Sequence, residues 1–176
     1  MAVEKRVNQS VVRLMKGDIT DMEIEAFVFY ARHDLVVGTG FGTAISTRGG
    51  PTIQKELEEL APLQTGEAVV TAAGTLKAKH VVHAVGPRFQ EEDTEGKLRT
   101  TILNSLKRAE EKGIKQIALP AMGAGFYGIP LDVCARVMVE TIKGYLEGET
   151  VIKEVILCML DSREYEPFNF QLARLD

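Results

Sequence analysis

The sequence predicts an α/β fold in which helices cover both faces of a sheet. Segments with strand-like and helix-like patterns alternate along all 176 residues, which is the order typical of layered α/β proteins. Most strand-like segments are continuous runs of Val, Ile and Leu, too apolar for a sheet with one solvated face. Because no repeat, low-complexity tract or linker-like run divides the chain, we expect one domain over residues 1–176.

Six short apolar segments are predicted as strands: residues 10–15, 26–30, 68–72, 80–85, 116–119 and 154–159. A long helix is predicted over residues 95–112, where apolar side chains recur at steps of four and three until Gly113 provides a natural stop. A second covers residues 131–146, with Pro130 near its start. We expect shorter helices at about 51–60, near Gly42 and at 166–175.

Composition limits the classes of function. The formal net charge is −4 and no basic run indicates nucleic acid. No stretch approaches the roughly 18 consecutive apolar residues of a membrane span. The first ten residues lack the apolar segment of a secretory signal, so a cytoplasmic location is the default expectation.

The positions of the cysteines and histidines bear on disulfides and metal sites. Cys134 and Cys158 sit in apolar stretches and are predicted to be free, buried thiols. The three histidines and two cysteines show no ligand-like spacing, so no metal site is expected. His80 and His83, at and within a predicted strand, are interpreted as packing residues.

Glycines concentrate in two runs, each joining a predicted strand to a predicted helix: residues 38–42, with Gly38, Gly40 and Gly42, and residues 123–128, with Gly123, Gly125 and Gly128. Ligands in α/β folds bind at the carboxyl ends of the strands, and glycine lets backbone N–H groups approach an anion at a helix start. Two such loops indicate a pyrophosphate site. Neither run is a Walker A loop or a G-x-G-x-x-G motif in a leading βαβ unit, which disfavours an ATPase or a Rossmann dehydrogenase.

Five motifs, in order and spacing, resemble the macro domain family. They are GDIT at residues 17–20, GFGTAI at 40–45, GEAVVT at 66–71, HAVGP at 83–87 and LPAMGAGFYG at 119–128. The resemblance covers residues 10–161. It implies a three-layer α/β/α sandwich with a central mixed, mostly parallel sheet and a cleft for ADP-ribose.

The resemblance also implies roles for single residues. Asp18 matches the carboxylate that accepts a hydrogen bond from the adenine amino group, with Ile19 beside the ring; the alternative is that Asp18 only caps a turn before Thr20. Leu160 matches a position often held by an aromatic that packs on the adenosine. The two phosphate loops are matched by Gly40, Phe41 and Gly42, which follow Gly38, and by Gly123, Ala124, Gly125, Phe126 and Tyr127, with Phe126 also against the distal ribose.

One segment departs from the hydrolytic members of the family. They carry Val-Asn-Ala-Ala-Asn where residues 28–32 read Val-Phe-Tyr-Ala-Arg, so Phe29 and Arg32 replace both asparagines. Arginine only donates hydrogen bonds and cannot act as a base near neutral pH. An aspartate that some hydrolytic members carry after the first glycine loop is also absent, and Gly42 stands in its place. Arg32, His33 and Asp34 are the remaining candidates for catalysis.

Three hypotheses follow. The leading one is a module that binds ADP-ribose, a related metabolite or ADP-ribosylated protein, without a cofactor and away from membranes. The second is a hydrolase of ADP-ribosyl esters, O-acetyl-ADP-ribose or ADP-ribose 1''-phosphate with an unusual site. The third is a divergent member that binds nucleic acid or is structural. The glycine loops separate the first two from the third, and the lost asparagines separate the first from the second.

Overall fold

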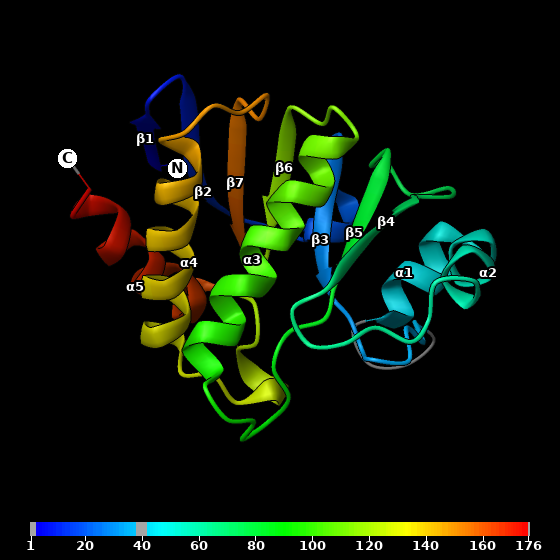
Figure 1. Ribbon diagram of the computed structural model, residues 1–176. Helices are drawn as coiled ribbons and strands as arrows, with labels where there is room; N and C mark the ends of the chain where they lie inside the picture. Colours follow the sequence, from blue (N-terminus) through cyan, green and yellow to red (C-terminus); the bar gives the residue numbers. More distant parts are fainter. Residues whose placement is uncertain (1–2, 38–41, 176) are drawn as a thin grey trace.

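The computed structural model describes residues 3–37 and 42–175, with the side chain of Phe126 excluded. Seven strands form one sheet in the order β1-β2-β7-β6-β3-β5-β4 (Figure 1). Neighbouring strands from β2 to β5 run parallel, whereas β1 and β4 are antiparallel edges. The strands are β1 Val3–Val7, β2 Ser10–Lys16, β3 Ala26–Tyr30, β4 Ala68–Ala72, β5 His80–Ala84, β6 Gln116–Leu119 and β7 Glu154–Met159. The predicted mixed, mostly parallel sheet is confirmed.

The edge strand β1 was not predicted. Its sequence, VEKRV, places three charged residues between two valines and so lacks the apolar run that marks the other strands. Charged side chains are typical of an exposed edge, where they discourage pairing with other chains. A tight turn joins β1 to β2, pairing Val7 with Ser10, and Asn8 takes a left-handed conformation there with φ of 55°.

Over the described ranges, five α-helices and two 3₁₀ turns accompany the sheet. They are α1 Gly42–Gly49, α2 Thr52–Glu58, α3 Thr94–Glu111, α4 Leu131–Leu146 and α5 Ser162–Ala173, with 3₁₀ turns η1 at Ile19–Asp21 and η2 at Gly125–Tyr127. Helix α5 begins four residues before the predicted start, because Asp161 caps it. The Asp161 carboxylate accepts from the Glu164 N–H at 3.0 Å, and the Glu164 carboxylate accepts from the Leu160 N–H at 2.8 Å.

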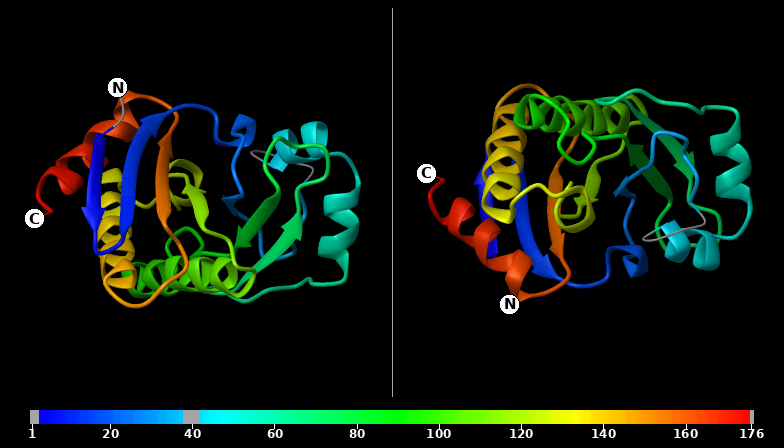
Figure 2. Two further views of the ribbon diagram at one scale, coloured as in Figure 1. Left: turned by 90° about the horizontal axis from the view of Figure 1, so that it is seen from above. Right: turned by 90° about the horizontal axis from the view of Figure 1, so that it is seen from below.

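Two apolar cores lie on opposite faces of the sheet, and the views in Figure 2 show helices on both of these faces. Helices α3, α4 and α5 cover the first core, which includes Val28 and Leu106. Helices α1 and α2 cover the second, which includes Phe27 and Ile45. Consecutive residues of β3 therefore point into different cores, which explains why the strands are apolar along their whole length and confirms the three-layer sandwich.

Buried sulfur and imidazole groups belong to these layers. Cys134 and Cys158 are free and buried. His83 lies in β5 with its Nε2 2.9 Å from the Thr71 hydroxyl, and burial lowers the pKa of His83 to about 3. The ring is therefore neutral, consistent with its interpretation as a packing residue, and His80 is partly buried at the start of the same strand.

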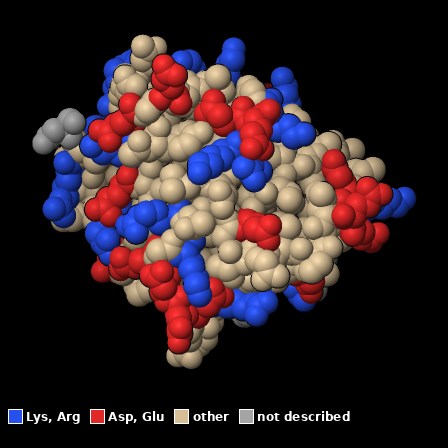
Figure 3. Space-filling view, viewed as in Figure 1, with Lys and Arg blue, Asp and Glu red and all other residues tan. Residues whose placement is uncertain are grey.

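The outer surface of α3 and α4 carries both signs of charge (Figure 3). Arg136 contacts Glu95 at 2.7 Å and Glu140 at 3.5 Å, joining the two helices. Such pairs are exposed and contribute little to stability. Within the described residues, no helix has the length and apolar character needed to cross a membrane.

Candidate functional site: a cleft at the carboxyl ends of the strands

One cleft collects residues that follow four parallel strands. Because β2, β3, β6 and β7 run in the same direction, their carboxyl ends meet at one edge of the sheet, which the right-hand view of Figure 2 faces. The lining residues are mostly apolar: Gly17, Asp18, Ile19, Thr20, Phe27, Val28, Phe29, Tyr30, Ala44, Pro120, Ala121, Gly123, Ala124, Tyr127, Cys158, Leu160 and Glu164. The structure thus brings the GDIT motif, the second glycine run and Leu160 to one place.

Asp18 both caps a turn and lines the cleft. Its Oδ1 accepts from the backbone N–H of Thr20 at 3.0 Å and from the Thr20 hydroxyl at 2.6 Å, which starts the 3₁₀ turn η1. Its Oδ2 accepts from Nη1 of Arg48, in α1, at 2.8 Å. The hydrogen bond from the Thr20 side chain, followed by that from Arg48, holds the pKa of Asp18 below its usual value. Asp18 is therefore an ionised acceptor.

The carboxylate of Asp18 keeps acceptor capacity toward the cleft. An ionised carboxylate offers about four lone-pair positions, and its contacts with described residues are the three just given. Ile19 and Leu160 lie in the same lining, and Leu160 is 57% exposed. This end of the cleft, called the adenosine end after the role proposed for it below, combines one acceptor with an exposed and a partly buried apolar side chain.

The second glycine run folds into a tight loop that glycine makes possible. Gly123, Gly125 and Gly128 have φ of 81°, 72° and 79°, in the left-handed region. The loop is closed by hydrogen bonds from the Ile129 N–H to the Gly123 carbonyl at 3.0 Å and from the Gly128 N–H to the Gly125 carbonyl at 2.9 Å. Because η2 begins at Gly125, its first N–H groups have no partner within the turn. Of this loop, Gly123, Ala124 and Tyr127 line the cleft.

The first glycine run is described only at its end. Gly38, Gly40 and Phe41 lie outside the described residues, as does the side chain of Phe126 in the second run. Gly42 starts α1 against the backbone of Val37, where an added Cβ would lie 2.5 Å from the Val37 carbonyl oxygen. The Ser46 hydroxyl donates to that oxygen at 2.9 Å. Any side chain at Gly42 would therefore displace the start of α1.

Tyr30 forms an aromatic wall that the sequence analysis missed. Its hydroxyl donates to the Pro87 carbonyl at 2.6 Å, and its ring lies 4.5 Å from that of Tyr127, centre to centre, tilted by 53°. The ring lies over Gly86, where a Cβ would collide with it. Burial raises the pKa of Tyr30, so the phenol stays protonated and donates.

Arg32, His33 and Asp34 lie in a shallow groove beside the cleft. We call the depression lined by Arg32, His33, Asp34, Arg88 and Tyr127 the outer groove. Arg32 pairs with Asp34 at 2.8 Å, with both side chains about half exposed at 49% and 50%. Tyr127 lines the cleft as well as the outer groove. The groove therefore continues the cleft past the second glycine loop.

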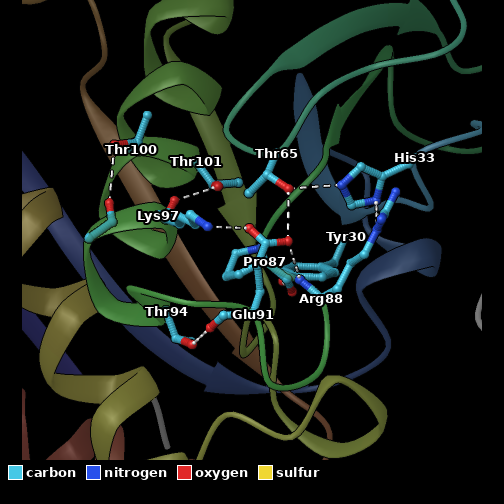
Figure 4. Close-up of polar contacts among 11 residues, drawn as sticks. Tyr30, His33, Thr65, Pro87, Arg88, Glu91, Thr94, Lys97, Thr100 and Thr101 are labelled. Carbon is cyan, nitrogen blue, oxygen red and sulfur yellow. Dashed lines mark hydrogen bonds and ion pairs between the residues drawn. The ribbon is translucent and has the colours of Figure 1, made fainter.

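His33 uses both ring nitrogens (Figure 4). Arg88 Nε lies 3.2 Å from its Nδ1, and the Thr65 hydroxyl lies 2.9 Å from its Nε2. Because Arg88 only donates, Nδ1 must accept, so the neutral ring carries its proton on Nε2. Burial and then the charge of Arg88 lower the pKa of His33. In this arrangement His33 holds Arg88 and presents no free nitrogen as a base.

The fold and this cleft define a class of protein. Comparisons with known proteins identify the family. The family model for the macro domain matches residues 31–138. A macro domain-containing protein of Caldanaerobacter subterraneus is 39% identical over 171 residues, covering 94% of this chain and 97% of the relative. An uncharacterized protein of Saccharolobus solfataricus is 42% identical over 161 residues, covering 89% of each. The chain belongs to the macro domain family.

Solved macrodomains share the architecture. The macrodomain of Oceanobacillus iheyensis with ADP superposes with a TM-score of 0.92 at 25% identity, covering 98% of this chain and 95% of that one. Its G37V mutant was solved with ADPR, at the same TM-score and identity, covering 98% and 97%. The Trypanosoma brucei macrodomain in complex with ADP-ribose gives 0.84 at 26% identity, covering 90% and 68%.

Proposed function

We propose that this protein binds ADP-ribose, free or attached to protein, in the cleft. The observation that carries the proposal is the meeting of the ionised Asp18 and the second glycine loop in one cleft. The adenine amino group donates hydrogen bonds, so it suits an acceptor such as Asp18. Ile19 and Leu160 cover the ring. The structural neighbours solved with ADP, ADPR and ADP-ribose support this assignment.

The phosphates are assigned to backbone donors. The N–H groups at the start of η2 and the start of α1 offer hydrogen bonds and the positive end of a peptide dipole. Hydrogen bonds to a charged group contribute about 1.5–3 kcal/mol each. Two such loops favour a ligand with two phosphates over one with a single phosphate.

The end of the cleft that meets the outer groove at Tyr127, called the distal end, favours binding without hydrolysis. Phe29 and Arg32 stand where hydrolytic members keep asparagines, and Arg32 is paired with Asp34. A phenyl ring cannot orient water, and a guanidinium can only donate. The ligand is therefore held and not cleaved.

Calorimetric titration with ADP-ribose, ADP, AMP and a poly-adenylate oligomer tests the proposal. We expect ADP-ribose and ADP to bind more tightly than AMP, by at least about 10-fold, since this corresponds to about 1.4 kcal/mol. Equal affinities for AMP and ADP-ribose would contradict the use of two phosphate loops. Tightest binding of poly-adenylate would favour a nucleic-acid-binding member instead.

Two glycines provide a matched pair of variants. Gly125, in the second loop, and Gly113, at the end of α3, have φ of 72° and 70°, and both have open space around an added Cβ. Alanine at either position therefore costs similar backbone strain, about 1–2 kcal/mol. Gly125→Ala should weaken ADP-ribose binding on the order of 10-fold, whereas Gly113→Ala should leave it unchanged.

A further inference from the structure

We propose that the outer groove is a binding site for an oxyanion, a phosphate or carboxylate group, attached beyond the distal ribose of the bound nucleotide. Arg88 is its main ligand and Arg32 its second. This inference rests on the proposed function, because it takes ADP-ribose to occupy the cleft. It adds a second anion site to that of the pyrophosphate, built from side chains and not from backbone.

The position of the groove suits such a group. Tyr127 lies in the loop assigned to the phosphates and lines both the cleft and the outer groove. Arg32 and His33 follow β3 directly, and Arg88 follows the HAVGP segment after β5. A substituent that leaves the cleft past Tyr127 therefore meets these side chains first.

The charge of Arg88 is not neutralised by the nearest carboxylate. Glu91 accepts from the backbone N–H of Arg88 at 3.2 Å and from the Thr65 hydroxyl at 3.2 Å, both on Oε1, while its Oε2 pairs with Lys97 at 2.9 Å. Within residues 3–37 and 42–175, no carboxylate forms an ion pair with the Arg88 guanidinium. Its charge faces an external partner.

A chain of hydrogen bonds holds Arg88 in place (Figure 4). Arg88 Nε donates to His33, His33 Nε2 donates to Thr65, and the Thr65 hydroxyl donates to Glu91. Each donor–acceptor direction follows from the one before it, since arginine can only donate. Within the part of the chain that the structure describes, only Nε of the Arg88 guanidinium is bonded. The terminal N–H groups are therefore the ones proposed to bind the ligand, and their planar fork matches two oxygens of a phosphate or carboxylate.

The charged groups of the outer groove favour the binding of one anion. His33 is neutral, because burial and Arg88 lower its pKa. The groove therefore contains two guanidinium groups and the single carboxylate of Asp34. The exposed pair between Arg32 and Asp34 is weak, so Arg32 is able to exchange Asp34 for an oxygen of the ligand.

The first test compares ADP-ribose with ADP-ribose that carries a phosphate on its distal ribose, by calorimetry at low salt. We expect the parent protein to bind the phosphorylated ligand about 10- to 100-fold more tightly. Arg88→Gln should remove most of that preference and change the affinity for ADP-ribose less than about 2-fold. Arg6→Gln, an exposed arginine on β1 at the far edge of the sheet, matches the change in charge and should preserve the preference.

A second arm identifies the source of the oxyanion. ADP-ribosylated peptides with either glutamate or glutamine beside the modified residue replace the phosphorylated ligand. A preference for the glutamate peptide that Arg88→Gln removes supports a carboxylate ligand. The proposal is overturned if Arg88→Gln weakens every ligand by the same factor, or if the parent protein shows no preference in either arm.

His33 is a positioning residue, and its role is tested separately. His33→Ala should reduce the preference for the anionic ligand about 3- to 10-fold and leave ADP-ribose affinity unchanged, because it frees the Arg88 side chain. An NMR titration of the Arg88 Nε–H signal with inorganic phosphate, against chloride at equal ionic strength, does not depend on ADP-ribose. A response to phosphate in a protein that fails to bind ADP-ribose would refute the proposed function alone. If the protein binds ADP-ribose but shows neither a response of the Arg88 signal to phosphate nor a preference for the anionic ligands, only the proposal for the outer groove is refuted.

Discussion

The two ends of the cleft each place an arginine beside a side chain that fixes it, with opposite electrostatic results. At the adenosine end, Arg48 is held by the carboxylate of Asp18, and the pair leaves an acceptor facing the cleft. At the other end, Arg88 is held by a neutral imidazole, and the pair leaves donors facing the outer groove. Identical side chains thus serve different purposes according to their partner.

This difference favours one orientation of a nucleotide bound in the cleft. An adenine amino group donates, so it suits the acceptor end, and phosphate or hydroxyl oxygens accept, so they suit the donor end. A nucleotide bound in the reverse orientation would place its amino group against donors of the protein and its phosphates against the carboxylate of Asp18. The predictions below test each end in turn, beginning with the largest expected effect.

The distal end should support little catalysis. We expect release of ADP-ribose from mono-ADP-ribosylated carboxylates to be at least about 100-fold slower than with a competent macro-domain hydrolase, because Phe29 and Arg32 cannot aim a water at the anomeric carbon. A time course on an automodified ADP-ribosyltransferase, with both proteins run side by side, measures this. Comparable turnover that His33→Ala or Asp34→Ala abolishes would instead establish an enzyme with a rebuilt site.

At the adenosine end, Asp18→Ala should weaken ADP-ribose binding by roughly 1–3 kcal/mol, since a partly buried donor loses its partner. Because Asp18 also caps η1 and holds Arg48, the loss alone does not separate recognition from local folding. Asp18→Asn is the control. It keeps an oxygen for the Thr20 cap but replaces the oxygen that pairs with Arg48 by a donor. Because the pair with Arg48 is half exposed, its loss should change stability little.

Calorimetry with ADP-ribose and the inosine analogue distinguishes the two roles of Asp18. If Asp18 reads adenine, the Asn variant loses preference for the amino-bearing base while thermal unfolding stays close to the parent. If the Ala and Asn variants both bind ADP-ribose as the parent does, Asp18 is a turn residue only.

The smallest expected effect is a gain in affinity for ADP-ribose. Leu160→Tyr should tighten ADP-ribose binding about 2- to 10-fold, because an aromatic ring stacks on adenine for about 0.5–1.5 kcal/mol beyond its area. Leu160 is exposed, so the change should not disturb the core. The gain should be equal for ADP and ADP-ribose and absent for ribose 5-phosphate. Unchanged affinity for ADP would place Leu160 away from the base.

The sequence predicted most of the fold because its signals are local. Apolar runs marked every strand except β1, whose three consecutive charged residues are typical of an exposed edge. The start of α5 was missed because its cap, Asp161, stands five residues before the predicted helix. These errors concern chain segments whose structure depends on solvent exposure or on a single side chain.

The site was predictable only in part. Motif resemblance identified Asp18 and the second glycine loop, which the structure brings together. Tyr30 and Arg88 had a usable signal, since each directly follows or ends a segment at the carboxyl edge of the sheet. Arg48 had none, because its contact with Asp18 spans 30 residues. The link between Thr65 and Glu91 likewise spans 26 residues and depends on the fold itself.

The place of β2 in the sheet has a consequence for synthesis of the chain on a ribosome. Apart from the hairpin with β1, this strand pairs only with β7, which emerges about 140 residues later, and the Gly17 N–H donates to the Met159 carbonyl at 2.8 Å. The outer groove, by contrast, is complete once residue 127 is available. The Asp18 end of the cleft therefore depends on docking of the last strand, whereas every lining residue of the outer groove lies earlier in the chain. If Asp18 binds adenine as proposed, adenine binding requires that β7 has docked.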